Sequence, residues 1–324
     1  ILNLGARFDS FKSKVTPGQA ITATTSVTLS RTDDIFNYQA GLIFKPSTNT
    51  SVYASYATAA TPPNALLGEG QEQNGLGTTN TPAAITLLNS LKVEKTKSME
   101  LGAKADLLGG GLSLTAAIFE TKTDNARATG PTGLQEFIGK KRVRGAELGF
   151  TGNITDELSV TGGYSYLDAE ITDGGFTVLT AAAVPGQAAK TVQVASVNNG
   201  RQFPQTAKHT FTFWTNYQAT SKFAIGGGAF YTSRQFGGYQ DNRSATQNSA
   251  GVVTVNGPTK VIARTIPGYW RFDARLAYSF TDRIDLSVNI QNITDKTYFN
   301  QVYTSHYASI APARSAFATL SFKY

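Results

Sequence analysis

The side chains best suited to chemistry in this sequence are cations and aromatic rings in long polar segments. Arginine offers several donors with a permanent charge, and tyrosine offers a flat stacking surface. The net charge of +7 comes from scattered Lys and Arg, which favours anionic small ligands or lipopolysaccharide over nucleic acid. The candidates are Arg127, Arg142, Arg201, Arg234, Tyr239, Arg264, His306 and Tyr307. For each one alone, a solvated loop charge or a lipopolysaccharide contact is the alternative.

Catalysis and metal binding have little support among the residue types. The sequence has no Cys, so it contains neither a disulfide framework nor a thiolate metal site. Neither His209 nor His306 has a carboxylate at metal-ligand spacing. No nucleophile–base pattern converges either. We therefore expect no enzyme, no catalytic residue, no metal site and no cofactor.

The elements that must position the candidates are predicted strands. The stretch FNYQAGLIF, residues 36–44, alternates apolar and polar side chains, and this period of two indicates a strand. About 12 such strands are connected alternately by short turns and long loops, which is how outer-membrane β-barrels are built. No apolar run is long enough for a transmembrane helix. The sequence therefore predicts an all-β, antiparallel transmembrane barrel.

The two faces of each strand predict its surroundings. In YWRFDARLAYSF, residues 269–280, Phe272 and Leu276 share a face that would meet lipid, while Arg271 shares the opposite face with other charges. Buried charges need water or a partner, so the polar face is expected to line the lumen. The predicted lumen or plug-facing residues are Arg7, Asp9, Glu147, Arg271, Asp273 and Arg275. The predicted interfacial aromatics are Tyr53, Tyr56, Tyr217, Tyr231, Tyr269, Trp270 and Tyr298.

The two ends of the chain also look like strands. The start, ILNLGARFDSF, alternates from its first residues, so we expect that an N-terminal part is missing. The close, FATLSFKY, places Leu320, Phe322 and Tyr324 on one face. It resembles the C-terminal signal that outer-membrane barrels present to their assembly machinery. The last strand would end on the short-turn side, so the C-terminus is expected in the periplasm.

Several phrases resemble the C-terminal β-barrel of TonB-dependent outer-membrane siderophore receptors of the catecholate and ferrichrome type. They follow the order of that family and cover most of the chain. The phrases lie at residues 51–63, 94–127, 142–171, 203–220, 266–280, 286–298 and 311–324. The resemblance implies that residues 1–324 are the C-terminal portion of a 22-stranded barrel, and that the N-terminal plug domain and the first strands are not in this chain.

The resemblance implies a function in iron uptake. Such a receptor binds a ferric siderophore, here a catecholate, at its extracellular loops and imports it with energy from the TonB–ExbB–ExbD complex of the inner membrane. The Arg and Tyr candidates would form its binding vestibule. Lipopolysaccharide and the barrel assembly machinery are further expected partners, with the outer membrane of a Gram-negative bacterium as location.

The sequence is also compatible with three alternatives. The strands could close as an independent barrel, because an even strand count permits it. The receptor could carry another ligand, such as cobalamin, haem or an oligosaccharide. A passive porin-like barrel is the third reading.

Overall fold

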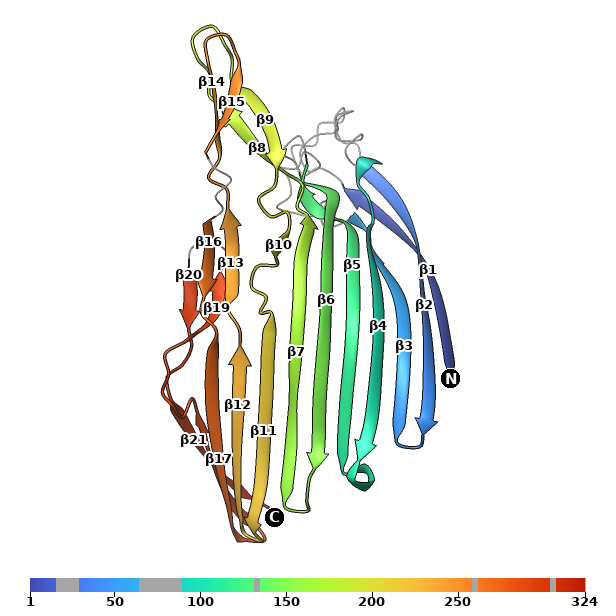
Figure 1. Cartoon of the computed structure of the whole chain (residues 1–324), viewed down its shortest axis with the longest axis vertical. Helices are drawn as coiled ribbons and strands as arrows, with labels where there is room; N and C mark the ends of the chain where they lie inside the picture. Colours follow the sequence, from blue (N-terminus) through green and yellow to red (C-terminus); the bar gives the residue numbers. More distant parts are fainter. Residues whose placement is uncertain (16–28, 64–88, 131–134, 258–261, 304–306, 324) are drawn as a thin grey trace.

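A computed structural model describes residues 1–15, 29–63, 89–130, 135–257, 262–303 and 307–323. Its main feature is one antiparallel sheet in which twelve strands follow each other as neighbours (Figure 1). These strands are β1 (Leu2–Val15), β2 (Leu29–Ser47), β3 (Thr50–Thr61), β4 (Glu94–Leu107), β5 (Leu112–Thr129), β6 (Gln135–Asn153), β7 (Leu158–Asp173), β11 (His209–Thr220), β12 (Phe223–Thr232), β17 (Tyr269–Thr281), β18 (Ile284–Gln291) and β21 (Ser315–Phe322). The short strand β10 (Arg201–Gln202) also pairs with β7. The predicted all-β antiparallel fold with about 12 strands is confirmed.

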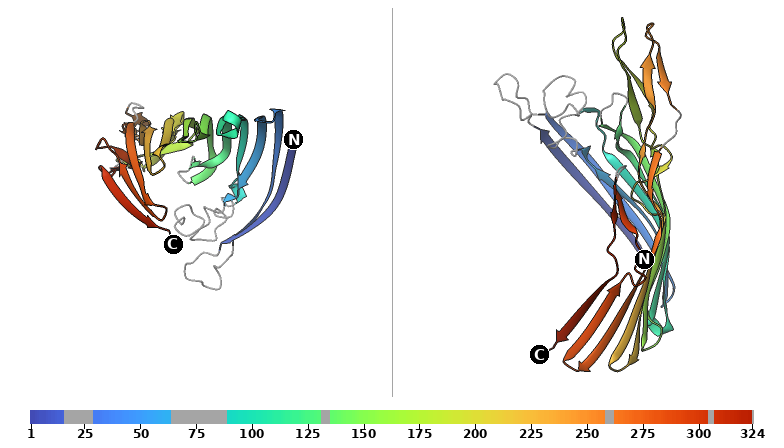
Figure 2. Two further views of the ribbon diagram at one scale, coloured as in Figure 1. Left: turned by 90° about the horizontal axis from the view of Figure 1, so that it is seen from below. Right: turned by 90° about the vertical axis from the view of Figure 1, so that its left-hand side faces the viewer.

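The sheet curves like part of a barrel wall (Figure 2). Within the described residues it does not close, since β1 pairs only with β2 and β21 pairs only with β18. None of the helices in the described part of the chain is long and apolar enough to cross a membrane.

The two faces of the sheet differ as the alternation predicts. On β4, Met99 and Leu101 are exposed by half, whereas Ser98 and Glu100 on the other face are less exposed. Side chains diverge on the convex side of a curved sheet and converge on its concave side. The apolar face is therefore the outward, convex one, as in a barrel surrounded by lipid.

Some predicted girdle aromatics do not face outward. The Tyr53 hydroxyl donates a hydrogen bond to Glu100 Oε1 at 2.5 Å, on the polar face. Tyr269 stacks on Tyr298 at a ring distance of 4.2 Å, and Tyr269 shares the face of Arg271. The girdle prediction is wrong for Tyr53 and Tyr269, because the parity of each residue along its strand turns the ring to the polar face.

The long connections are more regular than predicted. Those after β7 and β12 supply a four-stranded sheet, β15–β14–β8–β9, that projects beyond the main sheet (Figure 1). The pairs β13–β16 and β19–β20 are separate two-stranded sheets. Their bounds are β8 (Phe176–Ala181), β9 (Lys190–Ala195), β13 (Gln235–Gln240), β14 (Ser244–Gln247), β15 (Val253–Asn256), β16 (Ile262–Ile266), β19 (Phe299–Tyr303) and β20 (Tyr307–Ile310). The polar composition of these segments does not distinguish strands that pair outside the membrane from irregular loops.

The short connections all lie at the opposite end of the sheet. A single 3-10 turn, η3 (Leu108–Gly110), joins β4 to β5. Gly109 has φ +66° and Gly110 has φ +96° there, a conformation that favours glycine. Lys323 N donates to Arg283 O in the β17–β18 turn, so the described C-terminal end also lies on the short-turn side.

Candidate functional site

A row of cations and rings lies above the main sheet, where β10 passes β13. The Arg201 guanidinium stands 5.8 Å from the Tyr239 ring centroid. Tyr239 stacks on Phe236 at 5.9 Å, and Arg234 lies 5.4 Å from the Phe236 ring. We call these four residues the cation–aromatic row. It unites three predicted vestibule residues from two separate segments.

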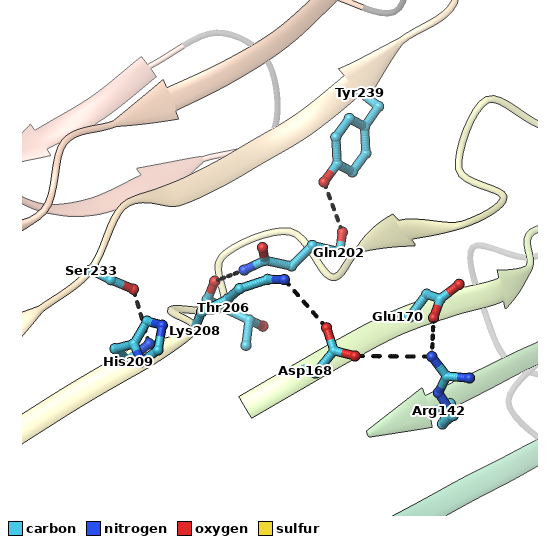
Figure 3. Close-up of polar contacts among 9 residues, drawn as sticks. All are labelled: Arg142, Asp168, Glu170, Gln202, Thr206, Lys208, His209, Ser233 and Tyr239. Atoms are coloured by element: carbon cyan, nitrogen blue, oxygen red, sulfur yellow. Dashed lines mark hydrogen bonds and ion pairs between the residues drawn. The ribbon is translucent and has the colours of Figure 1, made fainter. Parts of the chain in front are cut away.

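The row is held in place by main-chain contacts. The Tyr239 hydroxyl donates to Gln202 O at 3.0 Å, next to Arg201 (Figure 3). Gln205 N donates to Phe236 O, which ties the segment after β10 to β13. Burial raises the pKa of Tyr239, although Arg201 and the bond to Gln202 act in the opposite direction. Tyr239 therefore stays a neutral ring and donor at physiological pH.

Tyr239 also lines a cavity of about 450 Å³, together with Arg127 and Lys141. Lys141 lies six residues before Glu147 on β6, an even spacing that puts both side chains on the same, inward face. Its register partners are Thr123 and Ile171. Arg201 pairs with Ile171 and shares that face. The row and the cavity thus share Tyr239, and Arg201 and Lys141 both lie on the inward face of the main sheet.

Two carboxylates also line this cavity, and both have local partners. Asp241 Oδ2 accepts from Arg243 Nη2 at 2.6 Å, and this hydrogen bond holds the pKa of Asp241 below its usual range. The same Arg243 nitrogen also donates to Ala195 O, at the end of β9. Asp173 Oδ1 accepts from Gly175 N. Arg243 thus neutralises Asp241, whereas the amide of Gly175 leaves the charge of Asp173 in place. The cavity wall therefore presents Arg127 and Lys141 against the single charge of Asp173.

A second group of candidates lies on the other side of β16. Arg264 and Tyr307 border a cavity of about 480 Å³ with Tyr303. The two tyrosine rings stack at 4.9 Å. Within the β13–β16 pair, Arg264 is the register partner of Gly238 and Tyr239 that of Ala263. Arg264 and Tyr239 therefore occupy successive positions and point to opposite sides of this small sheet. His306 lies outside the described residues.

Arg142 differs from its prediction. It lies within β6, not in a loop, and shares the outward face with Leu148. Its guanidinium pairs with Glu170 and lies 3.9 Å from Asp168 (Figure 3). The placement of Arg142 in the vestibule is corrected, because the strands continue beyond the apolar zone and their parity turns it away from the lumen.

The predicted lumen residues lie on the polar face, and the charges are partly paired. Arg7 Nε lies 2.8 Å from Asp9 Oδ1. Arg271 Nη2 lies 2.9 Å from Asp273 Oδ2, and Asp273 Oδ1 accepts from Asn292 N. Glu147 and Arg275 share the same face, by the registers Glu147↔Ser165 and Arg275↔Gly226. Contact with a plug stays a prediction for all six.

The predicted C-terminal signal lies on the outer surface of the sheet as far as the structure describes it. Leu320 and Phe322 lie on the outward face of β21, opposite Leu286 and Ile284, and Tyr324 is outside the described residues. Their role as an assembly signal stays a prediction. Among the residues that the structure describes, no three His, Asp or Glu side chains are grouped to hold a metal ion.

Sequence reasoning missed one member of the site, Phe236. The segment RQFGGYQ contains the signal, since Phe236 and Tyr239 flank two glycines. Ordinary alternation would put these rings on opposite faces. The register shift between Phe236 and Gly238 brings them to the same side.

Comparisons with known proteins agree with this architecture. Residues 1–293 match the family model described as TonB dependent receptor-like, beta-barrel. The probable TonB-dependent siderophore receptor PiuA of Acinetobacter baumannii is 33% identical over 327 residues, which cover 100% of this chain and 38% of that protein. The catecholate siderophore receptor Fiu of Escherichia coli is 29% identical over 286 residues, covering 87% of this chain and 32% of Fiu.

Solved structures give the same result. The crystal structure of PiuA aligns with a TM-score of 0.73 and 32% identity, over 100% of this chain and 40% of that one. The closed form of Fiu aligns with a TM-score of 0.67 and 26% identity, over 98% of this chain and 41% of that one. This chain thus spans about two fifths of the length of these relatives. It belongs to the TonB-dependent receptor-like β-barrel family.

Proposed function

We infer that this chain is the lumen- and loop-forming part of a receptor for an anionic ferric chelate, with a ferric catecholate as ligand. The observation that carries the proposal is the cation–aromatic row beside Arg127 and Lys141. A tris-catecholate complex of Fe(III) carries negative charge on flat rings. Arginine can neutralise and hydrogen-bond its oxygens, while Tyr239 and Phe236 can stack on its rings.

The proposed ligand arrives with its iron already bound. The receptor then needs no catalytic group, cofactor or metal ligand of its own. The protein instead supplies charge, stacking surface and partial exclusion of water, which strengthens each ionic contact. The name of the relative Fiu supports a catecholate siderophore, and the name of PiuA supports a siderophore.

Import is proposed to use the TonB–ExbB–ExbD complex, acting on a plug domain encoded outside residues 1–324. The location is the outer membrane of a Gram-negative bacterium, with the long connections outside and the described C-terminal end in the periplasm. The barrel assembly machinery would recognise β21. Cobalamin, haem, an oligosaccharide and a passive pore remain the competing functions.

The test is ligand binding to the complete receptor. Ferric tris-catecholate and a ferric hydroxamate would be titrated at low and high salt, with quenching of tryptophan fluorescence as the signal. We expect tight binding of the catecholate alone, weakened by salt because surface electrostatics are screened. Equal binding of both chelates, or of neither, would refute the catecholate assignment.

A separate measurement addresses transport. Uptake of radioactive iron as the catecholate complex would be compared with and without a protonophore. A passive pore should be insensitive to the protonophore and conduct ions in planar bilayers. A TonB-dependent receptor should lose uptake and stay closed.

A further inference from the structure

Asp173 is a carboxylate in the wall of the cavity that also holds Arg127, Lys141 and Tyr239. It is the last residue of β7, where the pairing with β6 skips one residue between Ile171 and Asp173. Such a bulge re-aims the side chains beside it. An acid at this place is unexpected, because it opposes the positive charge that would attract an anionic ligand.

The charge of Asp173 is not balanced by a direct partner. Its register partner is Lys140, yet Asp173 belongs to none of the ion pairs that the described residues form. Its Oδ1 accepts a hydrogen bond from Gly175 N at 3.0 Å, and the described part of the chain supplies no hydrogen bond to Oδ2. An ionised carboxylate can accept several hydrogen bonds, so Asp173 keeps acceptor capacity as well as its charge.

The other carboxylate of the cavity has a structural role. Asp241 accepts from Arg243 Nε on Oδ1 at 2.9 Å and from Arg243 Nη2 on Oδ2 at 2.6 Å. Its charge and both of its oxygens are thus satisfied within the protein. Asp173 lines the same cavity and has no such partner among the described residues.

The turn after Asp173 holds its carboxylate in place. Gly175 has φ +72°, a conformation that favours glycine, and Gly174 N donates to Asn199 Oδ1 at 2.6 Å. Ser196 N donates to Gly175 O at 2.9 Å, which ties together the two ends of the connection after β7. Asp173 is therefore anchored through Oδ1 before a ligand binds, and a group that binds Oδ2 orders little additional side chain.

The charges of the cavity define a ligand with two unlike parts. The anionic part of the ligand can meet Arg127 and Lys141, and a flat ring can meet Tyr239. A group that reaches Asp173 must be a hydrogen-bond donor, and the strongest donors to a carboxylate carry a positive charge. A ligand without such a donor would bring its own negative charge beside the carboxylate, which lowers the affinity of that ligand.

We propose that Asp173 is a specificity-determining residue, which selects ferric chelates that carry an ammonium group beside the anionic iron centre. This inference rests on the proposed function, because it divides ferric catecholates into two classes. Chelates with an ammonium group are bound tightly, whereas otherwise identical chelates without one are bound less tightly.

The test uses the complete receptor and three ferric tris-catecholamide complexes built on one scaffold. They differ in one side arm, which ends in a primary ammonium, a hydroxyl or a methyl group. Quenching of tryptophan fluorescence measures each affinity. We expect the ammonium complex to bind about tenfold more tightly than the methyl complex, as for a hydrogen bond to a charged group. If the methyl or the hydroxyl complex bound as tightly as the ammonium complex, the proposal would be overturned.

The variant Asp173→Asn removes the charge, while its side-chain oxygen can still accept from Gly175 N. In this variant the ammonium complex should bind about tenfold more weakly, and the methyl complex should bind at least as tightly as to the parent. Retained binding of the methyl complex shows that the variant has folded. Weakening of all three complexes by the same factor would mean that Asp173 acts only through the turn, and it would overturn the proposal.

The matched control is Asp106→Asn. Asp106 lies near the short-turn end of β4 and also accepts a hydrogen bond from a local donor, the Ser113 hydroxyl. This control should keep the preference of the parent for the ammonium complex, and loss of the preference here would overturn the assignment to Asp173. If none of the three complexes bound the parent, the proposed function itself would fail, whereas equal binding of all three would refute only the selection.

Discussion

Lys141 and Arg142 are neighbours in β6 with the same charge and opposite surroundings. Lys141 lines the inward cavity with Arg127 and Tyr239, while Arg142 pairs with Glu170 on the outward face. One residue of offset in a strand changes the face. Charge near a loop therefore does not identify a ligand site in a barrel, because the parity of the residue along its strand decides which compartment the charge meets.

A leucine should fit on the outward face of β6 but not on its inward face. A Cβ on Gly145 would lie 2.5 Å from Phe119 Cζ and 2.5 Å from Tyr166 O, whereas Ala146 borders an open apolar groove of about 800 Å³ on the outward face. Gly145→Leu should therefore destabilise the complete receptor by about 1–3 kcal/mol or prevent its assembly. Ala146→Leu should be tolerated. Heat-modifiable gel migration and thermal unfolding would show the difference, and equal stability of the two variants would contradict it.

The next effect concerns ligand affinity at the inward site. Arg201→Gln removes a cation and Tyr239→Leu removes a stacking ring, so each should weaken ferric catecholate binding about tenfold. Arg283→Gln, in a short turn at the other end of the sheet, is the control. Fluorescence titration measures all three. Loss of affinity in the control as large as in Arg201→Gln would point to general electrostatics instead of a site.

A smaller effect is expected from the two neighbours themselves. Lys141→Gln should weaken catecholate binding about threefold, since one partly screened charge is lost. Arg142→Gln should leave this affinity unchanged, because its side chain lies on the outward face beside Glu170. Equal affinities of the two variants would contradict the assignment of opposite faces.

The smallest effect involves the support of the inward site. The pKa of Asp241 is lowered by its hydrogen bond to Arg243, so this pair stabilises the fold above the ordinary pKa of Asp, near 4. The contribution is lost as pH falls through the lowered folded pKa. Amide exchange in β14 should therefore accelerate severalfold, beyond the intrinsic change, between pH 5 and pH 2. Asp241→Asn should show fast exchange at both values, and a pH response like that of the parent would refute the role of the pair.

Much of the fold could be predicted from alternation and turn length. Those signals are local, since a strand at a lipid boundary needs apolar residues on one face only. The lumen charges Arg271 and Asp273 could be placed by parity alone. The errors came where parity was not applied, as at Arg142 and Tyr53. The strands of the long connections could not be predicted, because strands outside the membrane need no apolar face and so lack the alternation of apolar and polar residues.

The amino-acid pattern alone specifies the two faces of each strand, the alternation of short and long connections, and the family resemblance. Which side chains meet depends on tertiary contacts. The register of β4, β5 and β6 aligns Lys97, Lys122 and Arg142, and the packing of β13 against the segment after β10 brings Tyr239 to Arg201. Both depend on contacts between distant segments, and a one-residue slip in either would move these side chains apart.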